Sequence, residues 1–194
     1  MEKNILIAGV GGQGTILAGK IISQVALMAG YEVKVSEVHG MSQRGGSVVT
    51  QVRFGEHISS PIIIEGGADT IIAFELLEAL RILPELKKGG QMIVNEQMIP
   101  PMPVLIGVAT YPDTEEIKTQ ISAHAGEAIF FDALELALEA RAAQAVNVVL
   151  LGCFSRLLPM EEKLWYQAIK SLIKPQFVEM NLCAFALGKE VVSC

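Results

Sequence analysis

Two glycine-rich segments of the chain carry residue types that could bind an anion. The first, GVGGQG at residues 9–14, has the GxGxxG spacing, follows an apolar run and precedes a helical pattern. Glycines at this spacing allow a tight turn, and the N-terminus of the following helix offers backbone N–H groups to a phosphate or carboxylate. The segment predicts a dinucleotide- or anion-binding turn, or a turn whose glycines only let the strand and the helix pack closely.

The second segment, VHGMSQRGGSVVTQVRFG at residues 38–55, places a histidine, a serine, a glutamine and an arginine beside two adjacent glycines. The paired glycines permit backbone conformations that turn consecutive N–H groups toward an anion. Arg44 would add a bidentate donor for phosphate or carboxylate, and His39 and Ser42 would supply further polar contacts. The alternative is a surface turn in which Arg44 pairs with a carboxylate of the same domain.

Alternating apolar patterns predict the elements that hold these segments. Strands are expected at 4–10, 31–38, 47–54, 69–75, 91–96 and 127–133, and helices at 15–29, at 76–90 with a bend or break at Pro84, at 112–126, and from 134 to 191 with breaks at Pro159 and Pro175. The proline-dense stretch 98–104 is expected to be a surface connection or a rigid edge. The alternation predicts one α/β, Rossmann-like three-layer domain over residues 1–194, with a mostly parallel sheet, helices on both faces and a helical C-terminal third.

Both glycine segments are expected at one edge of this sheet. Each follows a strand at its carboxyl end, and in a doubly wound sheet the first two strands are neighbours. Gln13 and Arg44 should therefore lie on one rim, where folds of this class bind ligands.

Polar residues inside the C-terminal helices have structural explanations. The segment 142–154 is apolar on nearly every side, which predicts a buried helix. Asn147 and Asn181 sit among apolar neighbours and are expected to cap a helix or to bond between helices. Cys153 and Cys183 are expected to be small buried hydrophobic residues. His57 and His124 are expected to face solvent, so the catalytic residues stay unknown.

Composition narrows the function classes. The net charge of −6 argues against nucleic acid as a partner, because nucleic-acid binding needs a basic face. Three widely spaced cysteines suit a reduced cytoplasm and offer no CxxC, cluster or zinc spacing, so no metal site is predicted. Hydrophobic residues make up 51% of a chain without a transmembrane run, which predicts burial against another protein and no membrane contact.

The two segments together resemble a known family. GVGGQGTILAGKII (9–22) and SEVHGMSQRGGSVVTQVRFG (36–55) are similar to the gamma-type domain of the 2-oxoacid:ferredoxin oxidoreductases, and most similar to its arylpyruvate (indolepyruvate) members. The resemblance continues through ADTIIAFE (68–75), NVVLLG (147–152) and NLCAFALG (181–188), so it covers essentially the whole chain. Members that act on pyruvate, branched-chain oxoacids and 2-oxoglutarate share this domain.

The resemblance implies a subunit of a hetero-oligomeric oxidoreductase. Family members oxidatively decarboxylate a 2-oxoacid with coenzyme A, giving an acyl-CoA, carbon dioxide and two electrons for ferredoxin. It implies that a larger partner holds thiamine diphosphate and the iron–sulfur clusters, and that this chain binds none of them alone. The residues that it assigns to the two loops are Gly9, Gly11, Gly12, Gln13 and Gly14, and His39, Gly40, Met41, Ser42, Gln43, Arg44, Gly45 and Gly46. We expect this rim to dock on the partner's thiamine domain and to help cradle the anionic part of coenzyme A.

Two other functions stay open from the sequence. A free-standing NAD(P)- or flavin-binding oxidoreductase would use the GxGxxG turn, with Glu37 near the end of the second strand at the place of a ribose contact. A non-catalytic assembly or scaffold subunit would use the loops only to hold a complex together. Whether the isolated chain self-associates to cover its apolar surface is also left open.

Overall fold

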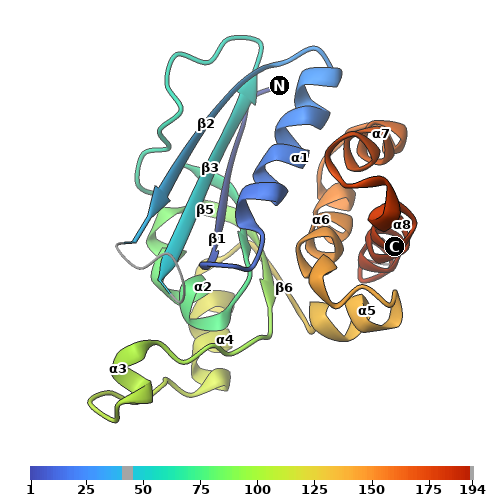
Figure 1. Cartoon of the computed structure of the whole chain (residues 1–194). Helices are drawn as coiled ribbons and strands as arrows, with labels where there is room; N and C mark the ends of the chain where they lie inside the picture. The colour runs from blue at the N-terminus through green and yellow to red at the C-terminus, as the bar shows by residue number, and fades with distance from the viewer. Residues whose placement is uncertain (41–45, 193–194) are drawn as a thin grey trace.

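Six strands form one sheet in a computed structural model that describes residues 1–40 and 46–192 (Figure 1). The strand order is β2-β3-β1-β4-β5-β6. The strands are β1 (Lys3–Val10), β2 (Glu32–His39), β3 (Ser47–Gly55), β4 (Ala68–Ala73), β5 (Leu86–Asn95) and β6 (Glu127–Phe131). Each predicted strand is therefore present, with bounds that differ by only a few residues at most ends.

Strand β3 gives the sheet its mixed character. β1, β4, β5 and β6 run parallel to one another, whereas β3 is antiparallel to both of its neighbours, β1 and β2. The prediction that β1 and β2 are neighbours is wrong. A short connection after β2 favours an antiparallel pair, so β3 pairs with β2 and takes the place beside β1. β1 and β2 still end at the same edge, because Val10 pairs with Ser47 and His39 with Val48.

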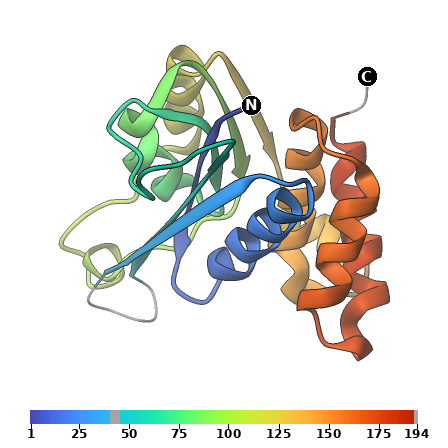
Figure 2. The same ribbon diagram turned by 90° about the horizontal axis from the view of Figure 1, so that it is seen from above.

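Five helices of the described chain lie on one side of the sheet, some against the strands and others stacked on those helices. They are α1 (Thr15–Met28), α5 (Ala133–Glu139), α6 (Val146–Leu157), α7 (Glu162–Leu172) and α8 (Val178–Glu190), with the short helices η2 (Ala143–Ala145) and η3 (Pro175–Phe177) between them. Figure 2 shows α1 lying along the sheet with α6, α7 and α8 stacked beside it. Sheet residues such as Ile7, Val52 and Ile93 share one buried cluster with these helices.

A smaller layer covers the opposite face. It consists of α2 (Leu76–Ile82), η1 (Leu83–Glu85) and α4 (Thr114–His124), while α3 (Met102–Leu105) projects from the edge of the molecule. Ile71 and Met92 of the sheet pack here with Ile117 of α4. Helices on both faces confirm the predicted three-layer α/β arrangement. The helix predicted to reach residue 90 is wrong: Pro84 has no N–H to continue the helical ladder, and β5 begins at Leu86.

The C-terminal helices pack closely through glycine. A Cβ atom added at Gly188 would lie 2.0 Å from the Val149 carbonyl oxygen, and one at Gly152 would lie 2.2 Å from the Phe185 carbonyl oxygen. α6 is buried along nearly its whole length, as its apolar sequence predicts. No helix in the described ranges has both the length and the apolar character needed to cross a membrane.

The two cysteines of these helices differ. Cys153 on α6 is buried, and burial raises the pKa of its thiol to about 12. Cys183 is exposed, so its predicted burial is wrong. α8 is an outer helix with one face on α6, and position 183 lies off that face.

Candidate functional site at the carboxyl edge

The first glycine segment forms a tight turn between β1 and α1. Gly12 (φ +104°) and Gly14 (φ +84°) adopt the left-handed conformation that glycine favours. A Cβ atom at Gly9 would lie 2.8 Å from Gln13 Oε1, and one at Gly14 would lie 2.9 Å from Asn147 Nδ2. Both backbone conformation and crowding therefore require glycine in this turn.

The start of α1 is open toward solvent. Gly14 is its N-cap, no side chain caps it, and its first turn holds no acidic residue. Among the described residues, the N–H groups of Gly12 and Gly14 have no protein acceptor. These donors lie at the positive end of the helix dipole, so the turn can receive an anion.

The two glycine segments meet at this edge. The Gly11 N–H donates to the Gly46 carbonyl at 2.9 Å, and the Gly40 N–H donates to the Ser47 carbonyl at 3.0 Å. Met41, Ser42, Gln43, Arg44 and Gly45 lie outside the described residues, and of His39 only the backbone at the end of β2 is described. The binding roles of both loops thus stay predictions.

The Gln13 side chain holds strand ends together. Its Oε1 accepts from the Val10 N–H at 2.7 Å, and its Nε2 donates to the Phe74 carbonyl at 3.0 Å and to Gln97 Oε1 at 3.1 Å. Both N–H bonds of this amide are therefore used within the protein. A ligand at the turn would meet backbone N–H groups rather than the N–H groups of this side chain.

A buried asparagine extends the network. Asn95 Nδ2 donates to the Phe74 carbonyl at 3.0 Å and to Gln97 Oε1 at 3.3 Å, and Asn95 Oδ1 accepts from the Ala133 N–H at 3.0 Å. The amides of Gln13, Asn95 and Gln97 thus join the carboxyl ends of β1, β4 and β5 to the start of α5. Sequence reasoning missed Asn95 and Gln97, although polar residues after an apolar strand are a usable signal.

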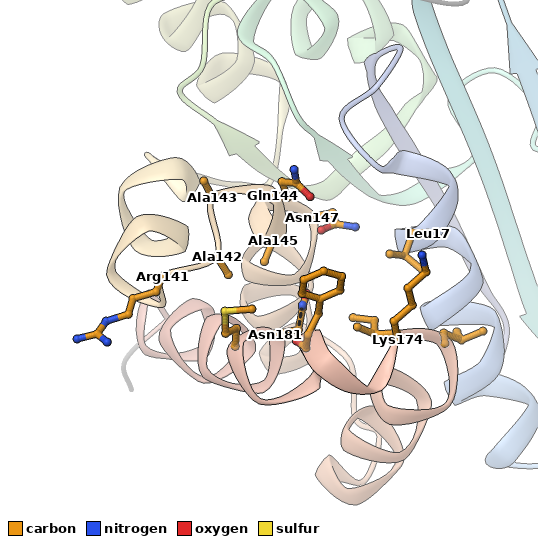
Figure 3. Close-up of a pocket in the computed structure, with 13 residues that line it drawn as sticks. Leu17, Arg141, Ala142, Ala143, Gln144, Ala145, Asn147, Lys174 and Asn181 are labelled. Carbon is orange, nitrogen blue, oxygen red and sulfur yellow. Dashed lines mark hydrogen bonds between the residues drawn. The ribbon is translucent and has the colours of Figure 1, made fainter.

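Two pockets adjoin the turn. The first, which we call the loop pocket, has a volume of about 560 Å³ and is lined by residues 12–14, Gln97, Gln144 and Asn147 with apolar neighbours. The second, the side pocket, has a volume of about 640 Å³ and lies between α1, the start of α6 and α8 (Figure 3). The pockets share Leu17, Ala143, Gln144 and Asn147, so they adjoin each other. Both volumes are in the range of small-molecule sites.

The side pocket is mainly apolar, with a few polar groups. Phe177 and Met180 line it together with Lys174 and Asn181, and Figure 3 shows the Arg141 side chain directed away. Asn181 Nδ2 donates to the Phe177 carbonyl at 2.8 Å, at the start of α8. Such a pocket suits the uncharged part of a ligand whose anionic part lies elsewhere.

Asn147 connects the pocket wall to the turn. Its Nδ2 donates to the Gly14 carbonyl at 3.3 Å, and its Oδ1 accepts from the Val148 N–H at 3.0 Å. The inter-helix bond predicted for Asn147 is therefore confirmed, because it joins α6 to the N-cap of α1. The prediction for Asn181 is wrong: it bonds to the carbonyl four residues earlier in the chain and neither caps a helix nor joins two helices.

Two buried carboxylates, those of Glu75 and Glu78, accept hydrogen bonds from segments at the same edge. Glu75, 1% exposed, caps α2 through the Glu78 N–H at 2.9 Å. The Glu75 carboxylate also accepts from the Ile99 N–H at 2.9 Å and from the Tyr111 hydroxyl. Burial, and then the bond to Glu75, raise the pKa of Tyr111 well above its ordinary value.

Glu78, 4% exposed, contacts the second glycine segment where β3 begins. Its carboxylate accepts from Ser47 Oγ at 2.5 Å and pairs with the Arg81 guanidinium at 2.6 Å. Sequence reasoning missed Glu75 and Glu78, which stand three residues apart directly after a buried strand. Glu78 thus fixes Ser47 at the start of β3, and Glu75 fixes Ile99 and Tyr111 of the chain after β5.

Other candidate residues lie apart from this edge. Glu37 is exposed on β2, which β3 separates from β1. In a dinucleotide site the acidic residue ends the strand next to the glycine turn, so this order counts against that use of Glu37. His57, with a side chain 85% exposed, and His124 face solvent as predicted. In the described part of the chain, no three His, Cys, Asp or Glu side chains gather as metal ligands would.

Comparison with known protein sequences gives full-length matches. Residues 4–191 match the family model described as pyruvate ferredoxin/flavodoxin oxidoreductase. "Indolepyruvate oxidoreductase subunit IorB" of Thermococcus kodakarensis is 45% identical, with 96% of this chain and 94% of the relative covered. "2-oxoglutarate synthase subunit KorC" of Methanothermobacter thermautotrophicus is 29% identical, with 99% and 96% covered.

Solved structures share the fold. The gamma subunit of a keto/oxoacid ferredoxin oxidoreductase from Geobacter sulfurreducens has a TM-score of 0.72 at 23% identity, with 97% of both chains covered. A 2-oxoglutarate:ferredoxin oxidoreductase from Magnetococcus marinus, with 2-oxoglutarate, coenzyme A and succinyl-CoA bound, has a TM-score of 0.75 at 22% identity. This chain covers 31% of that longer chain. The mixed six-stranded sheet with helices on both faces is therefore a fold found in such oxidoreductases.

Proposed function

This chain belongs to the pyruvate ferredoxin/flavodoxin oxidoreductase family, and we propose that it is the small subunit of an indolepyruvate (arylpyruvate) ferredoxin oxidoreductase. The observation that carries the proposal is the 45% identity to an indolepyruvate oxidoreductase subunit along nearly the whole length of both chains. The complex would oxidatively decarboxylate the 2-oxoacid with coenzyme A, giving an acyl-CoA, carbon dioxide and two electrons for ferredoxin.

We propose that a large partner subunit holds thiamine diphosphate and the iron–sulfur clusters. Support comes from this chain's residues: it has three cysteines, and its described residues bring together no set of metal ligands. Thiamine diphosphate would supply the carbanion chemistry, while this subunit positions and screens the reacting groups. The small subunit would then be one gamma-type domain over residues 1–194, acting in the cytoplasm and inactive alone.

The rim formed by the two glycine segments is proposed to help bind coenzyme A. The open N–H groups of Gly12 and Gly14 fit a phosphate, and Arg44 of the second segment would add a bidentate donor. The adjoining side pocket offers an apolar surface with a few amide groups to the uncharged arm of the same ligand. His39, Ser42, Gln43, Gly45 and Gly46 complete the proposed cradle.

The function is tested by anaerobic reconstitution with the purified large subunit of the same organism. We expect reduction of a viologen dye that depends on both indolepyruvate and coenzyme A. Arg44→Ala should raise the KM for coenzyme A about tenfold, the order of one charge-assisted hydrogen bond. Lys88→Ala, which removes an exposed cation at the opposite edge, is the matched control and should change nothing. No oxidation of any 2-oxoacid by the assembled complex would reject the function, and an unchanged KM in Arg44→Ala would reject the cradle.

The GxGxxG turn also fits one alternative to the proposed function, a free-standing NAD(P)- or flavin-binding oxidoreductase. Calorimetry of the isolated chain with NAD(P) and flavin nucleotides separates the two, because only the alternative requires tight binding without a partner. A pure assembly subunit is separated differently: its loop variants would lower complex yield but keep full activity per assembled complex.

A further inference from the structure

The segment from Gln97 to Pro112, which we call the arm, exposes large apolar side chains at the carboxyl edge. It contains no Asp, Glu, Lys or Arg. Its exposed side chains include Met98 (48%), Met102 (66%), Leu105 (66%), Ile106 (64%) and Val108 (73%). Isolated apolar residues on a surface are ordinary, but this many along one uncharged segment mark an interaction site.

The arm is fixed at both ends. Near its start, the Gln97 carbonyl accepts from the Leu76 N–H at 3.0 Å, and the Ile99 N–H donates to the buried Glu75 carboxylate at 2.9 Å. Near its end, the Tyr111 hydroxyl donates to that same carboxylate. One buried side chain thus anchors the two ends and sets the position of everything between them.

The middle of the arm has its own local structure. Pro101 and Pro103 flank the start of α3, and the N–H groups of Val108 and Ala109 both donate to the Pro103 carbonyl, at 3.0 and 3.1 Å. A segment already ordered by prolines and hydrogen bonds loses little conformational entropy when it binds. Such preorganisation is what a binding element needs and a simple connection does not.

The arm adjoins the rim of the proposed coenzyme A site. Gln97 bonds to Gln13 of the first glycine segment, so the base of the arm is continuous with that turn. Figure 1 shows α3 projecting at the edge where β1 and β3 meet the first glycine turn. A partner seated on the arm would therefore also reach the rim.

We propose that the arm is the main anchor by which this chain binds the large thiamine subunit, with α3 seated in an apolar groove of that subunit. The inference rests on the proposed function. Methionine and other large apolar side chains without charge are typical of interface centres. Relatives support a larger protein partner as the occupant, because in a Magnetococcus oxidoreductase and a ketoisovalerate oxidoreductase subunit the region that matches this chain is 31% and 36% of a longer chain, so there it is covalently joined to further protein.

Charge substitutions on the arm test the anchor. We expect Leu105→Asp and Ile106→Asp each to weaken binding of the purified large subunit about 30-fold or more, as loss of a central apolar contact does. Ile64→Asp is the matched control: Ile64 is 77% exposed, but precedes β4 at the opposite edge. Affinity is measured by calorimetry, after thermal unfolding has shown that all three variants fold like the wild type.

The outcomes test the role of the arm as the anchor separately from the proposed function of the chain. Loss of binding in both arm variants with an unchanged Ile64→Asp supports the anchor. If the wild type assembles with an active large subunit and Leu105→Asp assembles equally well, the anchor is wrong and the function stands. If the wild type binds no large subunit, both are wrong. An arm variant that only breaks a dimer of the isolated chain would assign the arm to a second copy and overturn the proposal.

Discussion

At the scale of single residues, two buried carboxylates determine the shape of the carboxyl edge. Among the described residues no cation bonds to Glu75: backbone N–H groups of Glu78 and Ile99 and the Tyr111 hydroxyl donate to it. A buried charge is costly unless donors satisfy it, so each of these bonds is strongly required. The arm is held in place because its ends supply two of the donors.

Replacing Tyr111 by phenylalanine removes one donor from this buried charge. We expect the free energy of unfolding at neutral pH to fall by about 1–3 kcal/mol, since a buried carboxylate loses a hydrogen bond. The change is measured by urea denaturation. Leu77 also loses the hydroxyl that accepts its N–H at 3.1 Å, which adds to the loss.

The same substitution should alter the dependence of stability on pH. Because burial and Glu75 raise the pKa of Tyr111 in the folded state, the neutral hydroxyl is favoured by folding. Its contribution is complete below the unfolded pKa of about 10 and is lost as the pH rises toward the folded value. The wild type should thus lose stability more steeply than Tyr111→Phe above pH 10. Parallel stability curves for the two proteins would contradict the assigned bond.

These residues also show what sequence could reveal about the site. The glycine turn was predictable because its spacing between a strand and a helix has few other uses. Glu75 and Glu78 were not, because a glutamate after a strand is nearly always exposed and only the folded arm shows what it binds. The roles of Asn95 and Gln97 could not be predicted either, because their bonding partners come from the ends of other strands and are brought together only by the fold.

At the scale of elements, the packing of α6 against α8 requires the two helix backbones to approach each other closely. Each helix presents a glycine at the contact, and the carbonyl of the other helix fills the space that a side chain would need. This packing fixes the position of α8, and with it the wall of the side pocket that includes Met180 and Asn181.

Gly188→Ala should therefore destabilise the protein. The added methyl would sit 2.0 Å from the Val149 carbonyl oxygen, so the helices must separate, at a cost of about 1–3 kcal/mol or more. In an exposed helix the same change would stabilise by about 1 kcal/mol through helix propensity, so the sign of the effect is decisive. It is measured by chemical denaturation.

A matched control lies two residues away on the same helix. Ala186 is exposed, and Ala186→Ser should leave the free energy of unfolding within about 0.5 kcal/mol of the wild type. A Gly188→Ala protein that is as stable as the wild type would show that α6 and α8 do not pack this closely.

The sequence predicted where the strands and helices lie along the chain better than it predicted which strands are neighbours in the sheet. Alternation located the strands because it reflects burial along each strand. The order in the sheet was not predictable in this way, since β3 has the same pattern whether it lies outside β2 or between β2 and β1. Lys87 and Lys88 belong to β5 rather than to a helix, because Pro84 ends the helix and the strand edge tolerates charge.

At the scale of the whole molecule, many of the apolar side chains are buried in the core. Two clusters on opposite faces of the sheet bury the strands and the inner faces of the helices. The arm carries five of the large apolar side chains that stay exposed in the described part of the chain. The arm is thus the surface at which the sequence-based expectation of burial against a partner can be tested.

Binding of the large subunit should protect this edge selectively from hydrogen exchange. With the partner at about 100 times its dissociation constant, mass action adds about 2.7 kcal/mol to the stability of this chain, which slows exchange globally by a uniform factor. Peptides from residues 97–111 and 9–14 should be slowed further, because the arm and the open N–H groups of Gly12 and Gly14 are covered directly. Residues 56–67 at the opposite edge are the internal control and should show only the global effect. Extra protection at 56–67 with none at 97–111 would place the partner on the wrong edge for both the anchor and the coenzyme A cradle.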